Sequence, residues 1–95
     1  MFIRIAEVAL LPDVAEEARR IYAEQAAPRV TGVAGNAGCY MLEPLDPDGP
    51  HLACTVWDSE ASARAYETSG AAKEVASLIS HAFAAPPRLR SYRKP

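Results

Sequence analysis

The sequence is poor in several features that would indicate a particular class of protein. Its 95 residues include only two cysteines, which excludes a disulfide scaffold, and no apolar run approaches the length of a membrane-spanning helix. The formal net charge of −2 gives no electrostatic reason to expect a nucleic acid or an anionic membrane as partner. No group of His, Cys and carboxylate residues has the spacing of metal ligands, so we predict no metal site.

The cysteines and the N-terminal stretch bear on the compartment in which the protein works. Cys39 and Cys54 both lie in apolar runs, so we expect buried free thiols in a reducing cytoplasm rather than a disulfide. The apolar stretch Met1–Leu11 is interrupted by Glu7, and no small-residue cleavage site follows it. We therefore expect no signal peptide.

What the chain does have is the composition of a small globular domain. Hydrophobic residues make up 49% and charged residues 23%, which excludes intrinsic disorder. The length predicts one domain over residues 1–95. Because alanine supplies much of the apolar share and aromatic residues only 7%, the core of a single chain should be thin.

The first part of the chain predicts a strand followed by a helix. Phe2–Leu10 is rich in Ile and Val and predicts a strand. Asp13 and Glu16 then form a capping-box pattern, and apolar residues at helical spacing predict a helix over residues 14–27.

The middle of the chain predicts a connection and a β-hairpin. Pro28 should end the first helix, and three glycines make Val30–Gly38 a flexible connection. Cys39–Glu43 and Leu52–Trp57 predict two strands that pair in antiparallel fashion around the turn-rich segment Pro44–Pro50.

The last part predicts a second helix and a final strand. Asp58 or Ser59 should cap the helix, which Gly70 interrupts. A helical stripe then follows, comprising Ala72, Val75, Ala76, Ile79, Ala82 and Phe83. Leu89–Tyr92 predicts the last strand, after a Pro-Pro pair. The resulting order, β-α-β-β-α-β, predicts an α+β fold of the ferredoxin-like type with an antiparallel sheet.

The pattern of the third strand predicts a homodimer. Thr55 and Trp57 lie on one face of this strand and Cys54 and Val56 on the other, and neither face is polar. Two helices in so short a chain can cover only one face of the sheet. We therefore expect the other face to pack against a second copy.

The chain resembles the antibiotic biosynthesis monooxygenase family, whose members are dimeric α/β barrels. The resemblance is carried by Gly38, Cys39 and Tyr40 on the second strand, by the run from Val56 to Ala61, and by Ala65, Tyr66 and Ser69 on the helix after it. The order of elements agrees over nearly the whole chain. The superfamily also holds haem-degrading enzymes, quinol monooxygenases and isomerases.

The resemblance implies a pocket between helices and sheet that binds a small aromatic or quinol-type molecule. Characterised monooxygenases of this type use no metal, haem or flavin, so no cofactor is expected. A phenol or hydroquinone is deprotonated and reacts directly with dioxygen. The protein then has to exclude water, hold the anion and place a base within hydrogen-bond reach.

Four residues are the predicted substrate contacts beside the tryptophan. Trp57 matches the family tryptophan, and its indole N–H is a candidate donor to a substrate oxygen. The other interpretation is that Trp57 only packs the corner between the strand and the helix. Tyr66 is either a hydrogen-bonding group or an amphipathic lid residue. Thr55, Tyr22 and Phe83 complete the set, although the helical position of Tyr22 is also that of a core residue.

His81 is the candidate general base, because the pKa of an unperturbed imidazole lies near neutrality. Its position beside the apolar stripe equally fits a boundary residue with one wet edge. His51 follows the turn-rich segment and is expected to be exposed.

Two departures from the family pattern keep other functions open. Ala53 stands where aromatic-ring monooxygenases carry an asparagine, and Ala76 where haem-degrading relatives carry a haem-ligating histidine. Haem degradation is therefore disfavoured. A non-catalytic binding or accessory protein, and an isomerase or cyclase, are the alternatives to a monooxygenase.

Overall fold

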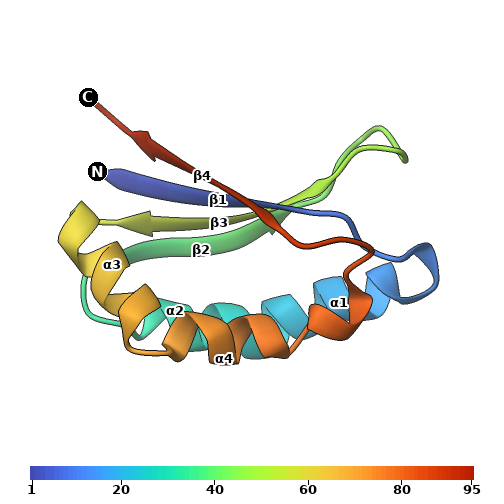
Figure 1. Cartoon of the computed structure of the whole chain (residues 1–95), viewed down its shortest axis with the longest axis horizontal. Coiled ribbons are helices and arrows are strands. Elements are labelled where there is room, and N and C mark those ends of the chain that lie inside the picture. The colour runs from blue at the N-terminus through green and yellow to red at the C-terminus, as the bar shows by residue number, and fades with distance from the viewer.

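The chain folds into a four-stranded antiparallel sheet that carries its helices on one face (Figure 1). In the computed structural model, which describes residues 1–95, the strands are β1 (Phe2–Val8), β2 (Asn36–Leu42), β3 (His51–Trp57) and β4 (Arg88–Arg93). Their order in the sheet is β2-β3-β1-β4, and each neighbouring pair is antiparallel. The predicted α+β, ferredoxin-like fold is confirmed.

The helical segment between β1 and β2 is longer than predicted and continues through Pro28. Helices α1 (Ala15–Ile21) and α2 (Ala27–Thr31) are joined by a π-helical segment, Tyr22–Ala26. At the end of that segment the Ala27 N–H donates to the carbonyl of Tyr22, five residues back. The widened turn accommodates the ring of Pro28, which lacks an N–H. The prediction that Pro28 ends the helix is wrong.

The predicted capping box at the start of this helix is also wrong. Residues Pro12–Val14 form a 3₁₀ turn, and no side chain caps either this turn or α1. Because the ring of Pro12 fixes its own φ angle at the first position of the turn, the chain enters the helix without a capping side chain.

The glycine-rich connection is more ordered than predicted. Val30 is buried within α2, and Gly38 is already part of β2. Between them Gly35 has φ of 84°, and its carbonyl accepts a hydrogen bond of 2.9 Å from the N–H of Asp58. A side chain at Gly35 would also collide with Asp58 and Ser62. Glycine is therefore required where the connection crosses the end of β3.

The helices between β3 and β4 begin and are interrupted at the residues predicted from the sequence. Ser59 caps α3 (Glu60–Thr68) by accepting from the N–H of Ser62 at 3.2 Å, and Gly70, with φ of 89°, separates α3 from α4 (Ala71–Ser77). The helix ends earlier than the apolar stripe suggests, because a 3₁₀ turn, Ser80–Ala82, leads the chain back to the sheet.

The two faces of the sheet have different surroundings. Ala53, Thr55 and Trp57 of β3 share one face of the strand, as predicted, and this face points toward the helices. The other face has no helix over it. The alternate residues form this outer face, and Tyr40, Tyr92 and Leu42 are each about half exposed there. A single chain therefore leaves an apolar sheet face uncovered.

Alternation also separates the two cysteines. Cys39 faces the helices and hydrogen-bonds to Tyr22, whereas Cys54 pairs in register with Tyr40 on the outer face. Both are free thiols, as predicted, but only Cys54 is fully buried and Cys39 is partly exposed. No helix of the structure is both long enough and apolar enough to cross a membrane.

Candidate functional site

The structure has two substantial cavities, at opposite ends of β3. One, of about 520 Å³, lies under the loop between β2 and β3, and only 4 of its 13 lining residues are hydrophobic. The other, of about 460 Å³, lies between the sheet and helices α3 and α4, and 14 of its 19 lining residues are hydrophobic. We call them the loop cavity and the helix–sheet cavity. Only the second has the mainly apolar walls of a site for an aromatic molecule.

The helix–sheet cavity brings together five of the six residues predicted from the sequence. Its lining includes Trp57, Tyr22, Tyr66, Thr55 and Phe83. They come from β3, from the helical segments before β2 and after β3, and from the segment before β4, so these residues meet only in the folded chain. The sixth residue, His81, does not line this cavity.

Trp57 is positioned by its neighbours and is not free to donate. Its side chain is 1% exposed, and the indole Nε1–H donates to Thr55 Oγ1 at 2.9 Å. The indole also stacks on Tyr66, with 5.1 Å between ring centroids and 34° between the planes. The hydroxyl hydrogen of Thr55 has no protein acceptor. Thr55, rather than Trp57, is therefore the group that offers a donor to the cavity.

The two cavity tyrosines keep their protons at neutral pH. Burial raises the pKa of Tyr66 to about 12. Burial also raises the pKa of Tyr22, whose hydroxyl oxygen lies 3.2 Å from Cys39 Sγ, and it raises the pKa of that thiol. Both phenols can act as hydrogen-bond donors to a ligand, and neither can act as a base.

One row of residues across the helix-facing side of the sheet is polar. Register pairing places Cys39, Thr55, Arg4 and Ser91 side by side on β2, β3, β1 and β4. The rows on either side are centred on Phe2 with Trp57 and on Ala6 with Ala53. Thr55 and Arg4, the two central members of this row, line the helix–sheet cavity.

Charged residues stand at the rim of this cavity, and sequence reasoning missed them. Arg4 forms an ion pair with Glu67 of α3, donating through Nε at 3.1 Å and through Nη2, and its Nη1 donates to Ser91. Lys73 of α4 also lines the cavity. The signal available in the sequence was an arginine among apolar residues at the start of β1, at two-residue spacing from Phe2 and Ala6.

His81 lies outside the site. Its side chain is 49% exposed, and Nε2 lies 3.4 Å from Glu17 Oε1 across the surface. The structure therefore does not bring the predicted base to Trp57. The alternative interpretation of His81, a boundary residue with a wet edge, agrees with this position.

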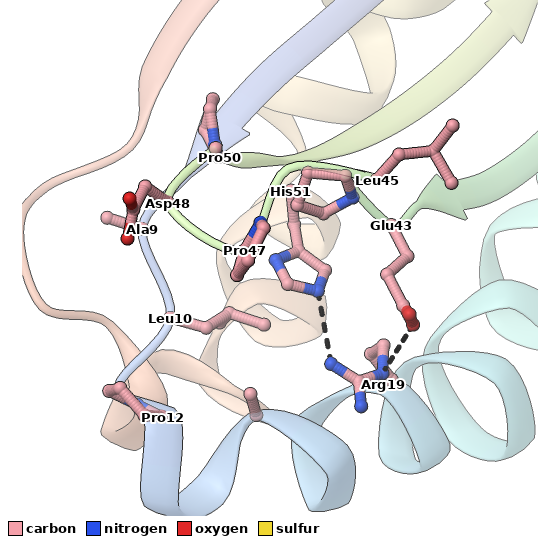
Figure 2. Close-up of a pocket in the computed structure, with 13 residues that line it drawn as sticks. Ala9, Leu10, Pro12, Arg19, Glu43, Leu45, Pro47, Asp48, Pro50 and His51 are labelled. Atoms are coloured by element: carbon pink, nitrogen blue, oxygen red, sulfur yellow. Dashed lines mark hydrogen bonds and ion pairs between the residues drawn. The ribbon is translucent and has the colours of Figure 1, made fainter.

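His51 was predicted to be exposed, and that prediction is wrong. The imidazole is 8% exposed in the wall of the loop cavity, and Nε2 lies 3.2 Å from Arg19 Nη1 (Figure 2). Arg19 Nε in turn lies 3.4 Å from Glu43 Oε1. A guanidinium can only donate, so Nε2 accepts and the ring proton is on Nδ1. Burial and the neighbouring Arg19 lower the pKa of His51.

The two alanines that depart from the family pattern both line the helix–sheet cavity. Ala53 and Ala76 present methyl groups there. No histidine lines the cavity, so the residues present do not provide the imidazole ligand that haem-degrading relatives use. No group of three or more His, Cys, Asp or Glu side chains that could hold a metal ion is found.

Comparison with known proteins agrees with this geometry. A family model described as "Antibiotic biosynthesis monooxygenase" matches residues 1–77. No protein with a curated description matches the chain.

Solved structures share the fold over the whole chain. A candidate antibiotic biosynthesis monooxygenase from Bordetella bronchiseptica superposes with a TM-score of 0.83 at 19% identity, covering 99% of this chain and 96% of its own. A second, from Nitrosomonas europaea, gives 0.81 at 14% identity, with 99% and 98% covered. The haem degrader MhuD from Mycobacterium tuberculosis, solved with two haems in its active site, gives 0.81 at 18% identity, with 99% and 95% covered.

Proposed function

The chain belongs to the antibiotic biosynthesis monooxygenase family, and we propose that it oxygenates a small phenol or hydroquinone in the helix–sheet cavity without a cofactor. The observation that carries this proposal is the cavity itself. It is mostly apolar, its lining includes Trp57 stacked on Tyr66, and its polar groups are few and fixed. Such a site suits a planar aromatic molecule with one or two oxygens.

In this proposal the substrate supplies the electrons. A phenol loses its proton, and the electron-rich ring reduces dioxygen. One oxygen atom enters the ring, the other leaves as water, and the ring leaves as a quinone. The contribution of the protein is to exclude water from the cavity and to hold the phenolate in one orientation.

Thr55 and Glu67 are the groups that we assign to the phenolic proton. The Thr55 hydroxyl oxygen already accepts a hydrogen bond from the Trp57 indole N–H, so the Thr55 hydroxyl hydrogen is left to donate to the phenolate oxygen. Glu67 is the carboxylate among the lining residues, and we assign it as the acceptor of the proton. His81 has no role in this proposal, because it lies outside the cavity.

Oxygen consumption tests the proposal directly. Purified protein is incubated with a panel of phenols and hydroquinones in an oxygen electrode, and quinone formation is followed in parallel. Turnover should stop under anaerobic conditions. Glu67→Gln should lower kcat by about a hundredfold, the usual contribution of a general base. His81→Ala is the matched comparison: a loss of that size with His81→Ala and none with Glu67→Gln would return the base role to His81.

A non-catalytic binding protein is the second candidate, and one observation favours it. Ala53 and Ala76 leave the cavity with fewer polar groups than relatives have at these positions. Saturable quenching of Trp57 fluorescence by a hydroquinone, with neither oxygen uptake nor product, would establish this function instead. Turnover that persists without dioxygen would indicate the third alternative, an isomerase or cyclase.

We further propose that the protein is a cytoplasmic homodimer closed through the outer face of the sheet. Half-exposed Tyr40, Leu42 and Tyr92 on an uncovered face support a second copy as the cover. Free thiols in both halves of the hairpin support a reducing compartment. Light scattering after size exclusion should give a dimer for the wild type, and Tyr40→Lys should give a monomer. Ala23→Lys, on the exposed side of the first helix, is the control that should stay dimeric.

A further inference from the structure

Charge at the rim of the helix–sheet cavity is unbalanced toward positive. Three charged residues line this cavity, Arg4, Lys73 and Glu67, so two cations share one carboxylate. The remaining lining residues carry no charge. An apolar cavity with an excess cation at its mouth is better matched to an anionic than to a neutral ligand.

Arg4 has hydrogen-bonding capacity left after its contacts within the protein. A guanidinium has five N–H donors. Arg4 uses three of them, two toward Glu67 and one toward Ser91, and the other two have no protein acceptor. The side chain is 26% exposed, so these donors are reachable from the cavity mouth yet partly withdrawn from water.

Lys73 is unpaired. It is exposed at the start of α4, and its ammonium group forms no hydrogen bond and no ion pair within the chain. By contrast, exposed Arg64 on the neighbouring helix is paired with Glu60 four residues earlier. The lysine that lines the cavity is therefore free to meet a ligand.

The position of Arg4 in the sheet sets where the anion would lie. Arg4 pairs in register with Thr55 on one side and with Ser91 on the other. Neighbouring strands lie about 4.8 Å apart, so Arg4 and Thr55 project from adjacent strands into the same cavity. A ligand can reach both groups from within one cavity.

From these contacts we infer that the ligand of the helix–sheet cavity is an aromatic acid: a planar ring with a carboxylate or similar anionic group, held by Arg4 and Lys73 at the cavity mouth. This inference rests on the proposed function, because it specifies the substrate of the same site. Arg4 and Lys73 act here as specificity-determining residues, and Glu67 competes with the ligand for Arg4.

Binding of three small probes tests the inference. The probes are 2-naphthoate, its uncharged carboxamide 2-naphthamide, and 2-naphthol, and affinities are measured by isothermal titration calorimetry. The carboxylate should bind about ten- to a hundredfold more tightly than the carboxamide, the range expected for hydrogen bonds to charged groups. Added salt should reduce this preference, because it screens a partly exposed ion pair.

Variants assign the preference to the named residues. Lys73→Gln, at an exposed position, and Arg4→Gln should each reduce the preference for the carboxylate, whereas Arg4→Lys should keep most of it. Glu67→Gln should increase it. Lys94→Gln, which removes the same charge near the end of the chain, is the matched control and should leave the preference unchanged. The double variant Arg4→Gln/Glu67→Gln avoids an unpaired carboxylate if Arg4→Gln alone is poorly folded.

The outcomes separate this inference from the proposed function. If naphthol and naphthamide bind as tightly as naphthoate, the inference is overturned while the aromatic site stands. It is also overturned if Lys73→Gln and the double variant weaken the acid and the amide equally. If none of the three probes binds, the proposed function falls, and the inference with it.

Discussion

The hydrogen bond between Trp57 and Thr55 gives the sharpest test of the site as described. Thr55→Val replaces a hydroxyl with a methyl group of nearly the same shape. The indole Nε1–H then loses its acceptor while the ring stays 1% exposed. The perturbation is therefore an unsatisfied buried donor rather than a cavity.

The size of the effect follows from that geometry. Leaving a buried donor without a partner costs about 1–3 kcal/mol. Valine returns part of this cost, because it favours strands and adds apolar area to the cavity wall. We expect a net loss of about 1–2 kcal/mol in the free energy of unfolding, after that compensation.

Urea unfolding followed by fluorescence measures this loss well, because Trp57 is the sole tryptophan. With an m-value of about 1–1.5 kcal/mol/M for a domain of this size, the midpoint should fall by about 1 M. The Tm should fall by about 4–8 °C for each kcal/mol lost. Protein concentration is held constant, since a dimer would make both midpoints depend on it.

A control variant and a double-mutant cycle make the result decisive. Thr55→Ser keeps the hydroxyl and removes one methyl group, at a cost of about 0.8 kcal/mol. In a Trp57→Phe background, followed by circular dichroism, Thr55→Val should cost little, because no indole N–H is left to satisfy. If Thr55→Val is as stable as the wild type in both backgrounds, the hydrogen bond does not hold Trp57, and our reasoning about the site is refuted.

Three further outcomes are expected. Gly35→Ala should destabilise the fold by about 2 kcal/mol or more, since an added Cβ would lie 2.8 Å from Asp58 Oδ1 at a φ of 84°. Gly70→Ala, with a similar φ but open space, should cost only about 1–2 kcal/mol, and equal urea midpoints for the two variants would contradict the packing argument. The free energy of unfolding should decrease as pH falls below about 6.5, because His51 stays neutral when folded and takes up a proton when unfolded. His51→Gln should reduce this pH dependence, and a dependence of the same size in that variant would assign it to other groups.

Local patterns were sufficient for the elements and for part of the site. The alternation in β3 predicted which side chains of that strand share a face, and Ser59, one of the two predicted caps, and Gly70 mark the limits of α3. These features depend on residues close together in the chain, so the sequence exposes them directly. The failures at Pro28 and at the capping box arose where a π turn and a proline-led 3₁₀ turn replaced the usual helix geometry.

Side-chain partners far apart in the chain could not be predicted in this way. His51 is buried because Arg19, more than thirty residues earlier, lies against it, and nothing near His51 in the sequence signals that contact. The same holds for Arg4 and Glu67, which are 63 residues apart and meet only when α3 packs on β1.

The sequence by itself thus determined the order of strands and helices, the family and the position of Trp57 at the end of β3, because hydrophobic periodicity and turn residues act locally. Only the tertiary structure decided the chemistry around that tryptophan. Sheet register brought Thr55 and Arg4 into one polar row, helix packing added Glu67 and Lys73, and the 3₁₀ turn at Ser80–Ala82 left His81 at the surface. Register and packing are properties of paired segments, and no single segment encodes them.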